Sequence, residues 1–137
     1  MPKQCTFCGS FEKPTRHHII KREFNGHNQR VIILCRDCHS RLENQLIEYA
    51  QNVDTFQGTT AISVGGASLE LHAGSTFVEP SEAVTLAADC DVFGCEIRDT
   101  GNDSRRQFEA FLHGGSVVTF TGSPSGKVYY STVYRKK

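Results

Sequence analysis

The sequence predicts an α+β fold in which a small metal-stapled ββα unit is followed by a small β-rich module. Three observations predict it: two C-x-x-C pairs that bracket two β-branched runs, an amphipathic stripe directly after the second pair, and a change to short, Gly-divided runs from Gly58 onward. We expect the first unit to cover residues 1–54 and the second to cover residues 58–137. A chain of 137 residues is long enough for one ordinary domain or for two small ones.

The first cysteine pair is Cys5 and Cys8 in CTFC, and the second is Cys35 and Cys38 in CRDC, with 26 residues between them. Two C-x-x-C pairs at this separation are typical of a tetrahedral four-thiolate Zn²⁺ site. Nothing in the sequence indicates an oxidising compartment, which disfavours a disulfide framework, and a redox-active C-x-x-C is the alternative. A unit of about 50 residues buries little apolar surface, so we expect the zinc ion to supply folding free energy.

The two runs between the cysteine pairs are TRHHII (residues 15–20) and RVIILC (residues 30–35), separated by the turn-prone NGHNQ. Their β-branched residues predict an antiparallel hairpin. After it, RDCHSRLENQLIEYAQNV has apolar residues at helical spacing, with Asp37 as the expected N-cap. Successive side chains of a strand point to opposite faces, so the adjacent His17 and His18 cannot have the same role.

This strand–strand–helix order, with two histidines on the first strand and His39 at the start of the helix, resembles the HNH endonuclease family, the ββα-metal finger nucleases. The resemblance covers about residues 5–49 and depends on CTFC, RHHII and LCRDCH. It implies a metal-dependent endonuclease that hydrolyses DNA phosphodiester bonds, with His18 as the general base that activates water. It also implies that His17 and His39 hold a catalytic Mg²⁺ or Mn²⁺ ion.

Two positions depart from the family pattern. Where the family has an Asn five residues before the third cysteine, this chain has Arg30. The helix position four residues after His39 is often a second histidine in the family, and here it is Glu43. A carboxylate on the same helix face is a reasonable ligand for a hard cation, so the expected set for the catalytic metal is His17, His39 and Glu43.

Charge is distributed unevenly along the chain, although the formal net charge is zero. Residues 1–44 contain eight Lys or Arg and four Asp or Glu, whereas residues 48–103 contain ten acidic residues and one basic residue. We therefore expect the first unit, and not the acidic module, to meet the phosphates of DNA. The residues expected to hold the DNA backbone are Lys21, Arg22, Arg36 and Arg41.

The competing function is a non-catalytic zinc-stapled module, a degenerate HNH finger that binds nucleic acid or a protein. Three roles stay open for the acidic module: self-association, binding of a protein partner, and shielding of the basic unit. Within it, DSRRQFEAFLHGG predicts a helix with Asp103 or Ser104 as its N-cap, and most other runs predict strands. Because the N-terminus has no apolar leader and no run is long enough to span a membrane, we expect an intracellular, cytoplasmic protein.

Overall fold

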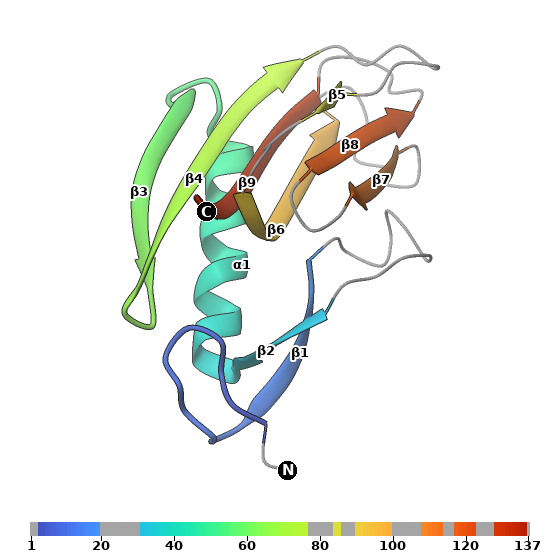
Figure 1. The fold of residues 1–137 in the computed structure, drawn as a ribbon. Helices are drawn as coiled ribbons and strands as arrows, with labels where there is room; N and C mark the ends of the chain where they lie inside the picture. Colours follow the sequence, from blue (N-terminus) through green and yellow to red (C-terminus); the bar gives the residue numbers. More distant parts are fainter. Residues whose placement is uncertain are drawn as a thin grey trace.

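The computed structural model describes residues 3–19, 31–76, 84–85, 90–99, 108–113, 117–122 and 128–136. Their helix and strands are shown in Figure 1: β1 (Pro14–His18), β2 (Val31–Cys35), α1 (Arg36–Gln51), β3 (Gly58–Val64), β4 (Ala67–Thr76), β5 (Val84–Thr85), β6 (Cys90–Asp99), β7 (Phe108–His113), β8 (Val117–Gly122) and β9 (Val128–Lys136). The strands form three antiparallel sheets in the orders β1-β2, β3-β4-β9-β6 and β5-β8-β7. The α+β class is therefore confirmed for this part of the chain.

β1 and β2 form the expected hairpin, with Pro14 opposite Cys35, and α1 follows β2 without a gap. The N-cap of α1 is Cys35, so the prediction of Asp37 was wrong. The Cys35 sulfur accepts a hydrogen bond from the Cys38 backbone N–H at 3.4 Å, and this satisfies one of the N–H groups that a helix start leaves unpaired. The helix start is thus set by the second cysteine pair.

Among the described residues, no helix is long and apolar enough to cross a membrane.

One face of α1 packs on the four-stranded sheet, where it contacts β6 and β9 (Figure 1). The buried residues of this face are Cys38, Leu42, Leu46 and Ala50. Two polar contacts fix the helix to β9: the Ser131 hydroxyl donates to the Leu46 carbonyl at 2.6 Å, and the Tyr129 hydroxyl donates to the carboxylate of Asp54, just after the helix. The sheet therefore holds α1 near its middle and beyond its C-terminal end.

Within the described residues, a hydrophobic cluster runs through both of the expected units. It joins Cys5 and Leu34 of the N-terminal part to Leu71, Phe93 and Val133 of the four-stranded sheet. The two sheets themselves stay separate, because none of the described strands of the larger sheet pairs with β1 or β2. The two units thus share a core, and the independent folding of the second unit stays a prediction.

The prediction of a helix within DSRRQFEAFLHGG is wrong for the residues of this run that the structure describes. Phe108–His113 forms strand β7, which pairs with β8 so that His113 lies opposite Val117. Helix propensity over so short a run is weak, and the neighbouring β-branched run VVTFTG supplies a hairpin partner for an extended chain. The expected caps, Asp103 and Ser104, lie outside the described residues.

Candidate metal centres

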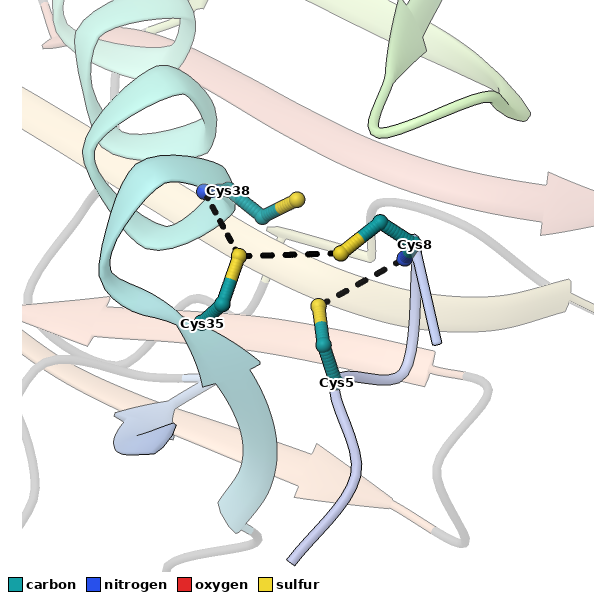
Figure 2. Close-up of side chains that lie close together, drawn as sticks. All are labelled: Cys5, Cys8, Cys35 and Cys38. Carbon is teal, nitrogen blue, oxygen red and sulfur yellow. Dashed lines mark hydrogen bonds between the residues drawn. The ribbon is translucent and has the colours of Figure 1, made fainter. Parts of the chain in front are cut away.

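The four cysteines predicted to bind zinc, called the cysteine cluster below, point toward one another in Figure 2. Their sulfur atoms all lie within 4.8 Å of one another. In each pair, the backbone N–H of the second cysteine is directed at the sulfur of the first, at 3.5 Å from Cys8 to Cys5 and at 3.4 Å from Cys38 to Cys35. The N-terminal turn, the end of β2 and the first turn of α1 therefore meet at one group of thiols.

The spacing of the sulfurs fits a tetrahedral zinc ion. The sulfurs of Cys8 and Cys35 are 3.7 Å apart, which is too far for a disulfide bond. Two thiolates bound at about 2.3 Å to a tetrahedral Zn²⁺ ion lie about 3.8 Å from each other. Four thiol ligands are also a common donor set for structural zinc. The cluster can hold a metal ion, and its residues fit zinc.

The thiols of the cysteine cluster differ in acidity. Burial by itself raises the pKa of Cys5, but backbone hydrogen bonds, that of Cys8 first, bring this pKa down to about 6. Burial raises the pKa of Cys38, and the neighbouring sulfurs raise it further. Since the thiolate is the ligating form, a metal ion that binds here has to displace protons, and we expect its affinity to increase with pH.

The turn between β3 and β4 packs against the cysteine cluster. A Cβ atom at Gly65 would lie 2.6 Å from the Cys38 sulfur and 3.0 Å from the Cys8 Cβ. The φ angle of Gly65 is +60°, a conformation that also favours glycine. At the next residue, Gly66, φ is +85° but nothing lies within 4 Å of the Cβ position. Gly65 is therefore the residue that lets the turn approach the thiols.

A second group of possible ligands consists of His17 of β1 with His39 and Glu43 of α1, and it is called the histidine cluster below. One ligand atom of each residue lies within 4.8 Å of the other two. His39 Nε2 is 3.1 Å from Glu43 Oε1, one helical turn away, and the rings of His17 and His39 meet edge to face with their centroids 5.0 Å apart. The structure thus brings together the three residues expected to hold the catalytic cation, while their metal role stays a prediction.

His17 is buried, with 3% of its surface exposed, and its Nε2 lies 2.7 Å from the carbonyl oxygen of Phe93 in β6. A carbonyl oxygen can only accept, so Nε2 carries the hydrogen and Nδ1 carries the lone pair. Nδ1 is buried and has no hydrogen-bond partner among the described residues. Burial lowers the pKa of His17 to about 4, so the ring is neutral at pH 7.

The tautomer of His39 is set by Thr15 of β1. The Thr15 hydroxyl donates its hydrogen to the Leu34 carbonyl at 2.6 Å and lies 2.8 Å from His39 Nδ1. Because that hydrogen is already used, Thr15 accepts a hydrogen bond from Nδ1–H of His39. Nε2 of His39 is then the atom that faces the Glu43 carboxylate, and two acceptor atoms at this distance need a proton or a cation between them.

The histidine cluster has the features of a metal site. Each imidazole donates its outer N–H to an oxygen outside the cluster, which is how most metal-binding histidines are oriented. Two imidazole nitrogens and one carboxylate oxygen form a mixed donor set, which suits Mn²⁺ better than Mg²⁺ because Mg²⁺ prefers oxygen ligands. The Nδ1 atom of His17 is buried and has no hydrogen-bond partner in the part of the chain that the structure describes, so it is the kind of atom that a cation would satisfy.

His18, the expected general base, is the last residue of β1 and is half-buried opposite Val31. Thr15 and His17 both face α1, so strand alternation turns His18 to the other face of the hairpin. The two adjacent histidines are therefore divided between two faces, as expected. The structure does not test the role of His18 as a base.

The residues expected to hold the DNA backbone are only partly described. Arg36 and Arg41 are exposed in the first two turns of α1, and Arg41 forms an exposed ion pair with Asp37 at 3.2 Å. Lys21 and Arg22 lie outside the described residues, as does Arg30, which replaces the Asn of the family.

Three residues that shape the two clusters were missed from the sequence: Thr15, Gly65 and Phe93. Thr15 could have been found, since it lies two residues before His17 and a strand puts both on one face. Gly65 lies in a Gly-Gly turn that the sequence shows, but its neighbours depend on how the hairpin packs. No sequence pattern indicated Phe93, because its contact with His17 is made by its backbone carbonyl and the two residues are 76 positions apart in the chain.

Comparisons of the chain with protein-family models, with curated proteins and with solved structures find no significant match. The resemblance to HNH endonucleases therefore depends on the residues and their spacing alone. The geometry of the two clusters is what bears on function.

Proposed function

We propose that this protein is a metal-dependent HNH-type endonuclease that hydrolyses DNA phosphodiester bonds. The observation that carries the proposal is the histidine cluster, in which one ligand atom each of His17, His39 and Glu43 lies within 4.8 Å of the other two. The order of His17 and His39 relative to the four cysteines resembles that of the family, and Glu43 stands where the family often has a second histidine. In this proposal a zinc ion at the cysteine cluster is structural and keeps β1, β2 and α1 together.

The second histidine of β1 supplies the proton transfer in this proposal. His18 accepts a proton from the attacking water, because a neutral imidazole is a suitable base near pH 7. Because His17 and His18 point to opposite sides of β1, His17 can ligate a metal ion while His18 faces the water. A divalent cation held by the histidine cluster would supply charge stabilisation at the phosphate and at the leaving oxygen. The donor set favours Mn²⁺ over Mg²⁺ for this position.

The DNA backbone is bound by charge. Arg36 and Arg41 are exposed near the start of α1, and guanidinium groups there would contact phosphates without reading sequence. The ion pair between Arg41 and Asp37 is exposed and therefore weak, so it does not prevent such a contact.

Self-association or a protein partner for residues 58–137 stays an expectation.

The proposal is tested by incubating supercoiled plasmid with the full-length protein and Mn²⁺, Mg²⁺ or EDTA. We expect nicking with Mn²⁺, weaker nicking with Mg²⁺ and none with EDTA. His18→Ala should slow cleavage by ~10²–10⁴ while Mn²⁺ binding is kept, because it removes the base only. His17→Ala and His39→Ala should instead weaken Mn²⁺ binding, with partial recovery of cleavage at high Mn²⁺. All three variants should retain zinc.

The competing function, a non-catalytic binding module, predicts that the protein does not cleave DNA. If the folded, zinc-loaded protein binds DNA or another protein and cleaves no plasmid with any metal at any pH, it is a non-catalytic zinc-stapled binding module. If cleavage is real but His18→Ala keeps full activity, the division of roles between the two histidines is wrong.

A further inference from the structure

Strand β6 contains a bulge at Phe93, and there a carbonyl group is directed at β1. Its pairing with β9 passes from Val92 to Gly94 and skips Phe93. The Phe93 carbonyl oxygen lies 2.7 Å from His17 Nε2. This hydrogen bond comes from the four-stranded sheet, whereas every residue of the histidine cluster belongs to the hairpin or to α1.

Gly94 allows β6 to come this close. A Cβ atom at this position would lie 2.7 Å from Leu46 Cδ1 and 3.4 Å from His17 Nε2. Its φ lies outside the left-handed region, so glycine is needed for space and not for backbone conformation. A larger residue has to displace the buried Leu46 side chain or push β6 away from α1, and a shift of β6 would move the Phe93 carbonyl relative to His17.

The side chain of Phe93 is held on two sides. Phe7, which lies between Cys5 and Cys8, meets its ring edge to face, with centroids 5.2 Å apart and an interplanar angle of 85°. The guanidinium of Arg135 lies 5.3 Å from the centroid of the same ring. The orientation of Phe93 is therefore fixed by residues outside the histidine cluster, one of them within the first cysteine pair.

We propose that the four-stranded sheet contributes to metal binding by the histidine cluster. The backbone carbonyl of Phe93 in β6 is the group that positions the His17 ring. By keeping the hydrogen on Nε2, this carbonyl leaves Nδ1 as the ligand atom and fixes the ring plane. Outer hydrogen bonds of this kind contribute about 10- to 100-fold to metal affinity in other proteins. The inference rests on the proposed metal-binding role of the cluster, but its test does not require catalytic activity.

The test uses two measurements on the full-length, zinc-loaded protein. Long-range ¹H–¹⁵N NMR reports which ring nitrogen of His17 carries the hydrogen, and we expect Nε2. A titration with Mn²⁺ compares the wild type with Gly94→Ala and, as a matched control, with Gly74→Ala. A Cβ atom at Gly74 would lie 2.7 Å from the Tyr130 hydroxyl oxygen, an equally close contact in the same sheet that falls on Tyr130 alone.

We expect Gly94→Ala to weaken Mn²⁺ binding by about 10- to 100-fold with unchanged zinc content, and Gly74→Ala to bind Mn²⁺ like the wild type. Unchanged affinity in Gly94→Ala, an equal loss in both variants, or a hydrogen on Nδ1 of His17 would overturn the positioning role and leave the nuclease proposal intact. Mn²⁺ binding without DNA cleavage would overturn the nuclease alone, and a wild type that does not bind Mn²⁺ would overturn both. If Gly94→Ala does not fold, the tautomer measured in the wild type decides.

Discussion

The cysteine cluster and the histidine cluster differ in where their geometry comes from. Each cysteine pair orients itself, since the N–H of its second residue is directed at the sulfur of its first, three positions away. The histidine cluster takes its ligands from two elements, and both rings are oriented by oxygen atoms of other residues, Thr15 and Phe93. A short sequence motif can specify the first kind of site, whereas the second kind depends on packing between distant segments.

The two clusters should therefore fail in different ways. If the cysteine cluster holds a structural zinc ion as proposed, loss of a cysteine ligand should remove the ion that joins the hairpin, the helix and the N-terminal turn, and the fold should be lost with the metal. Loss of an orienting group around the histidine cluster should leave the core intact and weaken the metal binding proposed for this cluster.

Cys35→Ser should have the largest effect, because it removes one thiol of the cysteine cluster, while serine can still cap α1 and so leaves the helix start intact. Structural zinc contributes on the order of 10 kcal/mol to folding of small units. Since the hydrophobic core is shared, we expect loss of zinc together with loss of the cooperative melting transition of the whole protein. Metal analysis and thermal unfolding followed by circular dichroism measure both, with His17→Ala as the variant that should keep zinc. A Cys35→Ser protein that melts like the wild type would contradict the structural role of the metal.

The next effect concerns pH. The pKa of His17 is lowered from 6.5 to about 4 by burial, so protonation favours the unfolded chain. The contribution of neutral His17 to the free energy of unfolding is fully present above pH 6.5, which is the pKa of this histidine in the unfolded chain. It is lost as the pH falls to about 4, and the total loss is about 3 kcal/mol. Urea unfolding across this range, without added Mn²⁺, measures the loss. His17→Gln is the control, because it keeps an N–H donor and does not titrate, and equal slopes for the two proteins would show that His17 is not the group concerned.

Much of the N-terminal part could be predicted from its sequence, for reasons that are local. The four cysteines follow from their spacing, and the pairing of β1 with β2 follows from β-branched runs on either side of a sequence that favours turns. His17, His39 and Glu43 were named as one set through the HNH resemblance, and strand alternation put His17 and His18 on opposite faces. In each case the relevant information lies in short motifs and their spacing within residues 5–49.

The remaining features could not be predicted because they depend on tertiary packing. Phe108–His113 looked helical, but β8 lies beside it as a pairing partner. An alternating strand shows which residues are buried and not which element buries them, so the shared core was not visible. The contact between Phe93 and His17 is made by a backbone carbonyl, which no side-chain pattern reveals.

The turn between β3 and β4 offers a comparison of two adjacent glycines. Gly65→Ala and Gly66→Ala both place a side chain at a positive φ, of +60° and +85°, but only Gly65→Ala collides with the Cys38 sulfur. We expect Gly65→Ala to lower the free energy of unfolding by about 1–3 kcal/mol more than Gly66→Ala, the usual range for overpacking. It should also release zinc at a lower chelator concentration. Chemical unfolding and a zinc-release titration measure the two effects, and identical behaviour of the variants would mean that the turn does not close on the cysteine cluster.

The smallest expected effect concerns Thr15, which orients His39. Thr15→Val keeps the shape of the side chain and removes its hydroxyl, so Nδ1–H of His39 loses its acceptor and the Leu34 carbonyl loses a donor. We expect unfolding to cost about 1 kcal/mol less, as for one net hydrogen bond, and Mn²⁺ affinity to fall by about 10-fold, the lower end for an outer partner of a metal ligand. Thr15→Ser restores the hydroxyl and should restore Mn²⁺ affinity, while zinc content stays constant in both variants. A Thr15→Ser protein that binds Mn²⁺ as weakly as Thr15→Val would show that Thr15 acts through packing in the hairpin, and wild-type affinity in Thr15→Val would show that His39 does not need this hydrogen bond.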